Sequence, residues 1–474
     1  MPKQLSREVP AALGAAERQR LHWAESNADL LAEASYAPWF EAIHREVPRI
    51  LAMERDDPAP LQPWPALVEP ATHRRWWGWN HALSQLLRSL PERFFASDPA
   101  ALFDFLGVGS ELLFDLVLSE PDGVSSALFR GDYLLTEEGL RCIELNVGAV
   151  GGWQNIAYGR LYEELPVWRR FLSENGLRAH FDDTVERMFE HAVRSTREAI
   201  DPPGSEINLL ILVAESGLSV AETHPQRLYE DLYRRALGAV NPALRGQLLV
   251  APNADLTFRR GQVRCGETAI HAVIEQDTEV TSRPLFRAFK AGSVHLLTGP
   301  LSMIFGDKRW LALMSTHQES DRFDEAEREL IRQVVPWTRQ LGPHEATWQG
   351  EAVFLPEWVE QAREELIIKS GQGYGGREIY IGCRTSPEEW RQAVADALDD
   401  GQWIVQEYLP TVPSPALARG GGWQPHDVVW GLFDLGDGAS GGFLRSAPRQ
   451  SEGRGVLNLV QGARIGLYFE VESE

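Results

Sequence analysis

The segment Phe129–Val147, which reads FRGDYLLTEEGLRCIELNV, is the most informative in the chain. It predicts a β-hairpin, because strand side chains point alternately to opposite faces and apolar residues alternate with polar ones on both sides of a turn. Glu137-Glu138-Gly139 suits a three-residue loop with glycine in the left-handed conformation, and this loop would pair Thr136 with Leu140. The apolar face would then contain Phe129, Tyr133, Leu135, Ile143, Leu145 and Val147.

The opposite face of this predicted hairpin gathers four polar side chains. The expected register places Asp132 across from Glu144, and Arg130 across from Asn146. Two carboxylates and an amide oxygen suit Mg²⁺, which keeps some water molecules and takes substrate phosphates as further ligands. The neighbouring guanidinium can hold a phosphoryl group in bidentate fashion. The alternative is a surface hairpin with cross-strand ion pairs, which are common in sheets.

Composition limits the class of protein. A chain of 474 residues, 43% hydrophobic and 24% charged, is expected to form about two to four domains of an ordinary soluble globular enzyme. The net charge of −22 argues against nucleic acid as a main partner. Cys142, Cys265 and Cys383 lie far apart, as is typical of a reduced, intracellular protein. We see no signal segment and no apolar run that could span a bilayer, so we expect a cytoplasmic protein without a membrane partner.

Lysine is rare in this chain. Of 46 basic residues only four are lysines, namely Lys3, Lys290, Lys308 and Lys369. Since arginine serves wherever a plain positive charge suffices, a retained lysine suggests the need for a compact ammonium group on a flexible stem. Lys308 is expected at the start of an apolar helix, where the helix dipole disfavours a cation. This placement indicates an anionic partner.

Residues 366–382 read LIIKSGQGYGGREIYIG and contain a glycine-rich loop. Three of its glycines formally match the dinucleotide fingerprint G-x-G-x-x-G, namely Gly371, Gly373 and Gly376. That fingerprint requires a helix directly after the glycines, whereas Arg377–Ile381 alternates like a strand. The segment therefore predicts a strand, a loop and a second strand. Such a loop can lay backbone N–H groups over phosphates, and Lys369 on the first strand can reach one.

A helix that begins after Ser386, with Pro387 at its first position, is expected to follow. Next comes Trp403–Leu409, a buried strand that ends in polar groups. Glu407 on this strand could accept hydrogen bonds from a ribose. The alternative is an ordinary carboxylate at the edge of a sheet.

The pattern of apolar residues predicts helices in residues 11–55, in 76–118 and around 180–200. After these, the strands 208–214 and 247–251 with the helix 225–237 between them read as a small doubly wound α/β unit. We expect four regions: a helical N-terminal region (1–118), the metal-binding hairpin with following helices (119–204), the α/β unit (205–300) and a nucleotide-binding part (301–474).

These motifs occur in a particular order along the chain: Arg130 and Asp132, Glu144 and Asn146, Asp307 and Lys308, Lys369 with its glycine loop, then Gln406 and Glu407. In this order they resemble the circularly permuted ATP-grasp ligases, and glutathionylspermidine synthetase-like proteins in particular. In ordinary ATP-grasp enzymes the lysines come first and the metal ligands last, whereas here the hairpin precedes both lysines. The resemblance implies a mixed α/β (α+β) ATP-grasp fold in permuted order, in which residues 205–300 form the domain that precedes the nucleotide domain.

The resemblance also implies a function, namely an ATP-dependent carboxylate–amine ligase that acts through an acyl phosphate. Its substrates would be a small-molecule carboxylate and an amine, amino acids or small peptides among them, and its cofactors ATP and Mg²⁺. Asp132, Glu144 and Asn146 would hold the metal, and Arg130 and Arg445 the phosphoryl group. The residues that would bind the nucleotide are Lys308, Lys369, Gly371, Gly373, Gly375, Gly376, Gln406 and Glu407. Two alternatives stay open: a kinase that acts on a small molecule, and a nucleotide-binding protein without catalysis.

Overall fold

The computed structural model describes most of the chain after residue 61. The described residues are 62, 64–107, 109–119, 126–148, 150–153, 155–200, 204–213, 224–275, 282–297, 304–373, 378–417, 423–436, 439–449, 457 and 462–474. The helices expected within residues 11–55 lie outside this set.

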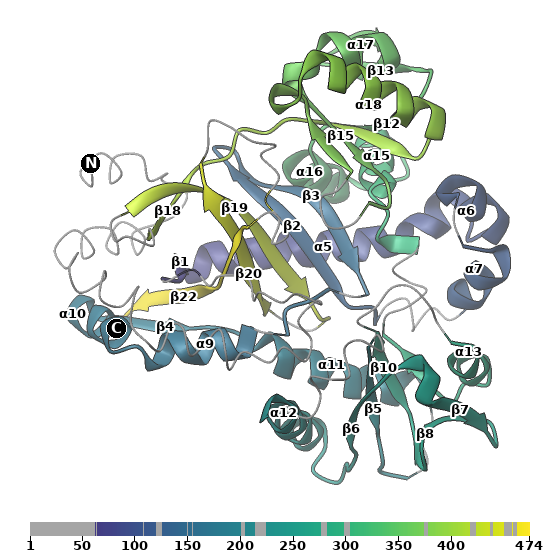
Figure 1. The fold of residues 1–474 in the computed structure, drawn as a ribbon, viewed down its shortest axis with the longest axis vertical. Helices are drawn as coiled ribbons and strands as arrows, with labels where there is room; N and C mark the ends of the chain where they lie inside the picture. Colours follow the sequence, from purple (N-terminus) through teal and green to yellow (C-terminus); the bar gives the residue numbers. More distant parts are fainter. Residues whose placement is uncertain are drawn as a thin grey trace.

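A large antiparallel sheet forms the centre of the molecule (Figure 1). Its strand order is β21-β20-β19-β2-β3, and a sixth strand, β18, also pairs with β19. The strands are β2 (Phe129–Thr136), β3 (Gly139–Val147), β18 (Ser414–Leu417), β19 (Trp423–Asp434), β20 (Ala439–Pro448) and β21 (Arg464–Gly466). The hairpin predicted from sequence is therefore confirmed, and it pairs with a strand almost 300 residues further along the chain.

Both faces of this sheet are covered, because its strands alternate between two apolar sets. Tyr133, Trp430 and Leu432 pack towards the long helix α5 (Pro70–Phe95). Phe433 and Phe443 belong to the core on the other face, which includes α11 (Thr184–Ala199). The helix expected around 180–200 is α11. Those expected within 76–118 are the end of α5, which begins earlier with Pro70 in its first turn, and the short helices α6 (Pro99–Leu106) and α7 (Glu111–Leu118).

A second, four-stranded antiparallel sheet lies above the large one in Figure 1. Its order is β12 (Thr338–Gln340), β17 (Trp403–Glu407), β15 (Leu366–Ser370) and β16 (Ile379–Ile381). The helices α17 (Leu355–Gln361) and α18 (Pro387–Asp400) pack on it, together with the hairpin β13 (Glu345–Trp348) and β14 (Glu351–Phe354). As predicted, α18 starts with Ser386 as its N-cap, and it ends at Gly401 in the left-handed conformation.

Two helices connect the sheets. These are α15 (Arg309–Thr316), which contacts β12, and α16 (Glu325–Val334), which contacts β3. The described residues also form single 3₁₀ turns, η4 (Asn253–Asp255), η5 (Arg363–Glu365) and η6 (Gly382–Arg384).

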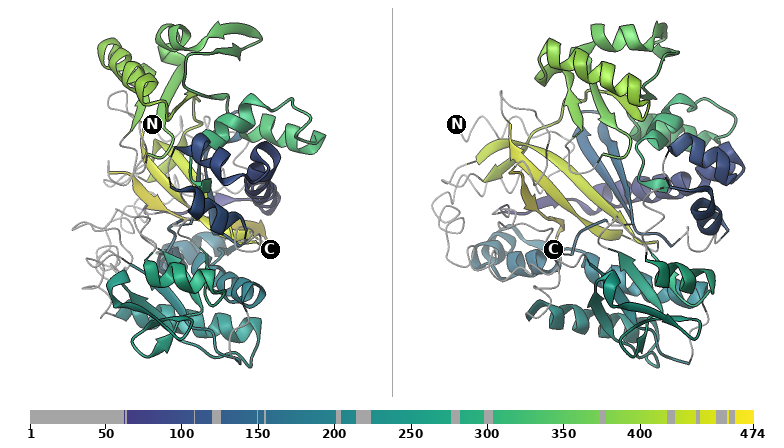
Figure 2. Two further views of the ribbon diagram at one scale, coloured as in Figure 1. Left: turned by 90° about the vertical axis from the view of Figure 1, so that its right-hand side faces the viewer. Right: turned by 45° about the vertical axis from the view of Figure 1, so that its right-hand side comes forward.

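A parallel sheet occupies the opposite end of the molecule, as the views in Figure 2 also show. Its order is β11 (His295–Leu296), β10 (Ala272–Glu275), β5 (Leu209–Leu212) and β6 (Leu248–Ala251). One face shares a core with α11 and α12 (His224–Val240). The other packs on α13 (Arg283–Lys290) and on the small sheet of β7 (Leu256–Arg259), β8 (Gln262–Cys265) and β9 (Thr268–Ala269). The predicted strands and helix of this unit are thus present.

A three-stranded sheet joins distant parts of the chain. Its central strand β22 (Tyr468–Ser473) pairs in parallel with β1 (Ala66–Val68) and antiparallel with β4 (Leu177–His180). The helices α9 (Asn155–Glu164) and α10 (Pro166–Asn175) precede β4. No helix in the described part of the chain is both long and apolar enough to cross a membrane.

Candidate active site

The β2–β3 hairpin has the predicted pairing at Arg130 and Asp132, but its loop is shorter than predicted and one strand contains a bulge. Thr136 pairs with Gly139, so the loop has two residues and the predicted three-residue loop is wrong. Tyr133 then pairs with Cys142, and the register shifts by one residue at Ile143, which forms a β-bulge. The extra residue reverses the alternation there. Cys142 is therefore buried on the apolar face, and Ile143, which was predicted to lie on that face, is only half-buried.

The bulge compensates for the shorter loop. Beyond it, Asp132 pairs with Glu144 and Arg130 pairs with Asn146, as predicted. The shorter loop moves the register by one residue in one direction, and the bulge moves it back. The four polar residues therefore occupy neighbouring positions at one end of the hairpin.

The carboxylate of Asp132 is fully buried and accepts four hydrogen bonds. Arg130 donates through Nε to Oδ1 (2.8 Å) and through Nη2 to Oδ2 (3.0 Å). Arg445, on β20, donates through Nη2 to Oδ2 at 2.5 Å, and the Nδ2 of Asn146 lies 3.2 Å from Oδ2. Two guanidinium groups thus meet one carboxylate, which leaves this group with an excess of positive charge.

Strand β19 makes room for this ion pair. Gly431 pairs with Asp132, and a Cβ atom there would lie 3.2 Å from Cδ of Arg130 and 3.3 Å from Oδ1 of Asp132. The ring of Phe443, on β20, lies under the guanidinium of Arg130 with 5.0 Å between Cζ and the ring centroid. Sequence reasoning missed both residues, although an isolated glycine in an apolar strand is a signal of close approach.

The second carboxylate, Glu144, faces a lysine. The Nζ of Lys308 lies 3.0 Å from Oε1 of Glu144 and donates to the carbonyl of Gly373 at 2.7 Å. Burial raises the pKa of Glu144, but Lys308 and Arg445 lower it further than burial raises it, to about 2. Glu144 is therefore ionised at neutral pH. The lysine itself is buried and connects the hairpin to the glycine loop.

Lys369, on β15, reaches across from the four-stranded sheet to the hairpin. Its Nζ donates to Oε1 of Gln406 at 2.8 Å and to the carbonyl of Ile143, the bulge residue, at 3.2 Å. Gln406 in turn donates to Oγ1 of Thr338 at 3.0 Å, which orients its amide. Burial lowers the pKa of Lys369 to about 8, although Glu144 acts in the opposite direction. Lys369 is therefore a cation at neutral pH whose hydrogen-bond partners are neutral.

The remaining predicted nucleotide residues belong to strand β17 or to the glycine-rich sequence that follows β15. Strand β16 pairs antiparallel with β15, which confirms the strand–loop–strand reading. Gly371 donates to the carbonyl of Gln402 and accepts from the backbone N–H of Lys308, both at 2.8 Å. Glu407 accepts a hydrogen bond from the backbone N–H of Trp337 at 2.8 Å. Gly375 and Gly376 lie outside the described residues.

Charge distinguishes this site from the rest of the molecule. Among the residues that the structure describes, four cations (Arg130, Arg445, Lys308 and Lys369) meet two carboxylates (Asp132 and Glu144). Two positive charges are therefore in excess there, in a chain whose net charge is −22. Uncompensated charge is costly to hold away from water. The cluster is therefore suited to an anion with several negative charges.

The donor set Asp132, Glu144 and Asn146 suits Mg²⁺ by its chemistry, since it offers carboxylate and amide oxygens. In this structure the two carboxylates contact Arg130, Arg445 and Lys308 instead. Among the residues that the structure describes, no group of three or more His, Cys, Asp and Glu side chains could hold a metal ion. A metal bound here would depend on the amide of Asn146 and on exchange of the carboxylates' present partners.

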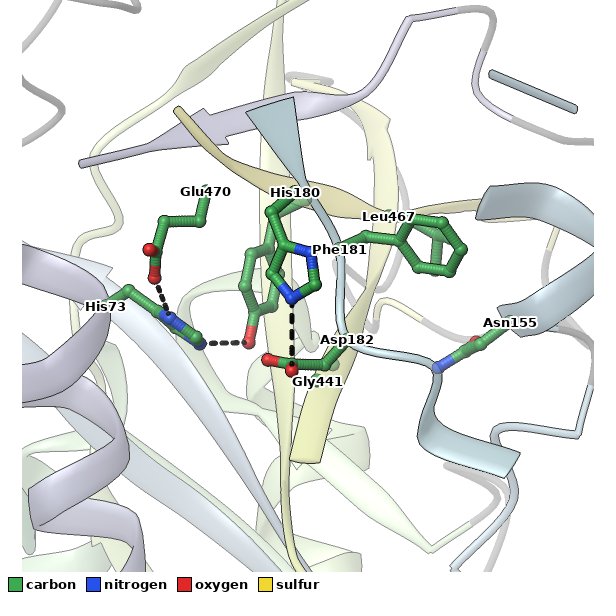
Figure 3. Close-up of a pocket in the computed structure, with 10 residues that line it drawn as sticks. His73, Asn155, His180, Phe181, Asp182, Gly441, Leu467 and Glu470 are labelled. Atoms are coloured by element: carbon green, nitrogen blue, oxygen red, sulfur yellow. Dashed lines mark hydrogen bonds and ion pairs between the residues drawn. The ribbon is translucent and has the colours of Figure 1, made fainter. Parts of the chain in front are cut away.

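A separate cavity lies between α5, β4 and β22 (Figure 3). Nδ1 of His73 lies 2.6 Å from Oε2 of Glu470, and Nε2 of His73 lies 3.3 Å from the hydroxyl of Tyr468. His180 and Asp182 form a second, longer pair at 3.5 Å. The cavity of about 10 Å³ has room for roughly one water molecule. It is too small for a nucleotide or an amino acid, and its polar contacts join the first described helix to the last strand.

The fold and the site define an α/β protein with a cationic cluster between two antiparallel sheets, in which the lysines are buried and the arginines half-buried. A solved structure shares this fold, a glutathione synthetase-like effector from Globodera pallida in its apo form. It is 12% identical, the alignment covers 94% of this chain and 95% of that one, and the TM-score is 0.54. At this identity the likeness shows the fold alone.

Two other solved structures align less well. A putative gamma-glutamylcysteine synthetase from Methylobacillus flagellatus is 10% identical over 82% of this chain and 88% of that one, with a TM-score of 0.37. The D-alanyl-alanine synthetase A of Vibrio cholerae is 10% identical over 57% of this chain and 90% of that one, with a TM-score of 0.27. No protein-family model and no curated protein sequence matches the chain.

Proposed function

We propose that this protein is an ATP-dependent carboxylate–amine ligase with an ATP-grasp fold in permuted order. The observation that carries the proposal is the cluster in which Lys308, Lys369, Arg130 and Arg445 outnumber the carboxylates that the described residues place beside them. A triphosphate supplies the negative charge that such a cluster lacks. The shared fold of the glutathione synthetase-like effector supports a ligase, and its name suggests amino acids or small peptides as substrates.

In this proposal the four-stranded sheet binds the nucleotide. Lys369 and Lys308 contact its phosphates. The Nζ of Lys369 lies beside the carbonyl of Ile143, and the Nζ of Lys308 lies beside the carbonyl of Gly373 and the carboxylate of Glu144. The loop that begins at Gly371 covers the phosphates with its backbone N–H groups. Gln406 orients Lys369, and Glu407 lies at the strand end where it can meet the ribose or the adenine edge.

The large sheet supports the phosphoryl transfer. A substrate carboxylate oxygen forms a bond to the γ-phosphorus as the bond to the bridging oxygen of ADP breaks. The amine then attacks the acyl carbon, phosphate leaves, and the nitrogen loses a proton. Arg130 and Arg445 neutralise charge on the phosphoryl group, which is the main contribution a protein makes to this chemistry. Asp132, Glu144 and Asn146 would hold Mg²⁺, which when bound neutralises phosphate charge.

The test is to incubate the protein with Mg-ATP and pooled amino acids, small peptides and polyamines, and to measure ADP, AMP, free phosphate and product masses. We expect equal amounts of ADP and phosphate, and a product one water lighter than its two components. ADP without phosphate would instead establish a kinase, and AMP would exclude the acyl-phosphate route. Nucleotide binding without turnover in any pool would favour a protein that binds without catalysis.

A further inference from the structure

Arg309, directly after Lys308, is almost wholly buried and uses its guanidinium within the protein. Its Nε donates to Oδ1 of Asp307 at 2.9 Å and its Nη2 to Oδ2 at 2.6 Å, a bidentate pair. Nη1 donates to the carbonyl of Phe105 at 2.7 Å, and Nη2 also donates to the carbonyl of Leu106. With these contacts and 1% exposure, Arg309 does not itself reach a ligand.

The two carbonyls belong to the last turn of α6, in the N-terminal helices. Carbonyls at the end of a helix have no partner within it and bear partial negative charge, so a guanidinium there satisfies and neutralises them. Gly107, which ends α6 with φ of 64°, also approaches Gln402, since a Cβ on it would lie 2.7 Å from Nε2. The end of α6 therefore touches both the Lys308 turn and the segment before β17.

The same contacts reach the glycine loop. The backbone N–H of Lys308 donates to the carbonyl of Gly371, whose own N–H donates to the carbonyl of Gln402. A Cβ on Gly371 would lie 2.9 Å from Oδ1 of Asp307 and 3.1 Å from Nε of Arg309. The Asp307–Arg309 pair therefore fills the space beside the first glycine of the loop. One buried ion pair thus contacts the lysine turn, the loop entry and the N-terminal helices.

We propose that Arg309 is a positioning residue for the nucleotide. It holds the turn that carries Lys308 and the entry of the glycine loop against α6, so the N-terminal helices set where the phosphate-binding groups lie. This inference rests on the proposed role of Lys308 in nucleotide binding. Lysine cannot replace Arg309, because it lacks the planar fork that serves Asp307 and both carbonyls together.

The experiment measures equilibrium binding of ATP, and KM for ATP against kcat, in Arg309→Lys. We expect the dissociation constant and KM for ATP to rise by ~10-fold or more, with a smaller change in kcat, because small displacements of binding groups have large effects. The matched control is Arg93→Lys. Arg93 makes a bidentate pair with Glu327 at 2.7 and 2.6 Å and joins α5 to α16. This control should lower the melting temperature and leave ATP binding unchanged within ~2-fold.

The following outcomes would contradict the positioning role of Arg309. If Arg309→Lys lowers the melting temperature but binds ATP as the wild type does, the positioning role is wrong. If Arg309→Lys does not fold, Asp307→Asn, which keeps the size of the side chain, is measured in the same way and decides. Lys308→Met separates this inference from the proposed function. Unchanged ATP binding in Lys308→Met would overturn the nucleotide-binding role of Lys308, and with it this inference, whereas the ligase function is decided by the product assay. A loss of binding in Lys308→Met with unchanged binding in Arg309→Lys would overturn the positioning role alone.

Discussion

The two sheets that border the site hold their charges in different ways. On the large sheet, Asp132 lies between Arg130 and Arg445, and every member of this group has an oppositely charged partner. On the four-stranded sheet, the partners to which Lys369 donates within the described part of the chain are neutral, namely the amide of Gln406 and the carbonyl of Ile143. We call the Arg130–Asp132–Arg445 group the preassembled wall, and Lys369 with its two partners the other wall. Under the proposed function, the other wall gains a directly contacting ionic partner when the phosphates of ATP bind.

The largest effect should follow from neutralising the centre of the preassembled wall. Asp132→Asn leaves two guanidinium groups beside a neutral amide, so we expect turnover to fall by at least ~100-fold, as when a key electrostatic group is lost. Turnover is measured as ADP release with the substrates that the pooled assay identifies, together with the unfolding midpoint.

The control for this variant is Asp427→Asn. Asp427 lies on neighbouring strand β19 and accepts from Nε of Arg449 at 3.0 Å, outside the site. Its turnover should stay within ~3-fold of the wild type. Near-normal turnover in Asp132→Asn would contradict the assignment of Asp132 to the site.

The second prediction concerns the other wall and alkaline pH. The pKa of Lys369 is lowered by burial to about 8, from 10.5. Below pH 8 the lysine is charged in both the folded and the unfolded state, and its buried charge destabilises the folded protein. As pH rises from 8 to about 10.5 the folded state loses this proton first, so the free energy of unfolding should gain ~2 kcal/mol from this group.

Denaturant titrations at pH 7.5 to 10 test this, with Lys369→Met beside the wild type. The gain should be absent in Lys369→Met and present in Lys290→Met, since Lys290 is exposed on α13. An equal gain in wild type and Lys369→Met would show that Lys369 titrates normally. Saturating ATP should reduce the gain, because phosphate would supply the missing ionic partner.

A third, smaller effect is expected at acid pH. Burial raises the pKa of Glu144, but Lys308 and Arg445 bring it down to about 2, below the ordinary value of 4.5. A lowered pKa contributes stability above pH 4.5 that is lost as pH falls towards 2. Since its side chain is 24% exposed, solvent screening reduces the contribution to ~1–2 kcal/mol.

Acid unfolding of Glu144→Gln tests this point. The variant should lose less stability than the wild type between pH 4.5 and 2.5. Glu327→Gln is a suitable comparison, because the pKa of Glu327 is lowered by its hydrogen bond to Arg93, away from the site. If Glu144→Gln and wild type follow the same acid curve, Lys308 does not hold the carboxylate in solution.

The smallest effect should come from the end of β17. Glu407 accepts one hydrogen bond from the N–H of Trp337 and is only half-buried. Glu407→Gln keeps an acceptor oxygen, so ATP binding should weaken by only ~3-fold, while Glu364→Gln on the exposed η5 turn should not change it. A loss of ~100-fold in Glu407→Gln would mean that this carboxylate has a larger role than the lysines.

Local signals predicted much of the fold. Alternation predicted the β2–β3 hairpin, and the absence of a helical pattern after the glycines predicted the β15–loop–β16 unit. Capping residues predicted the start of α18 at Ser386. These features depend on side-chain direction and backbone preference within a few residues, which a sequence displays directly.

The sequence by itself determined which chemical groups stand at successive positions of each strand, and so the pairing of Asp132 with Glu144. Tertiary structure decided how that pairing is reached, because a two-residue loop and a bulge at Ile143 cancel each other and no local pattern distinguishes them from one longer loop. It also decided that Arg445 donates a hydrogen bond to Asp132, 313 residues earlier in the chain, and that Arg309 donates to a carbonyl at the end of α6. Contacts between remote segments depend on how whole sheets pack, and the alternation within one strand does not encode that packing.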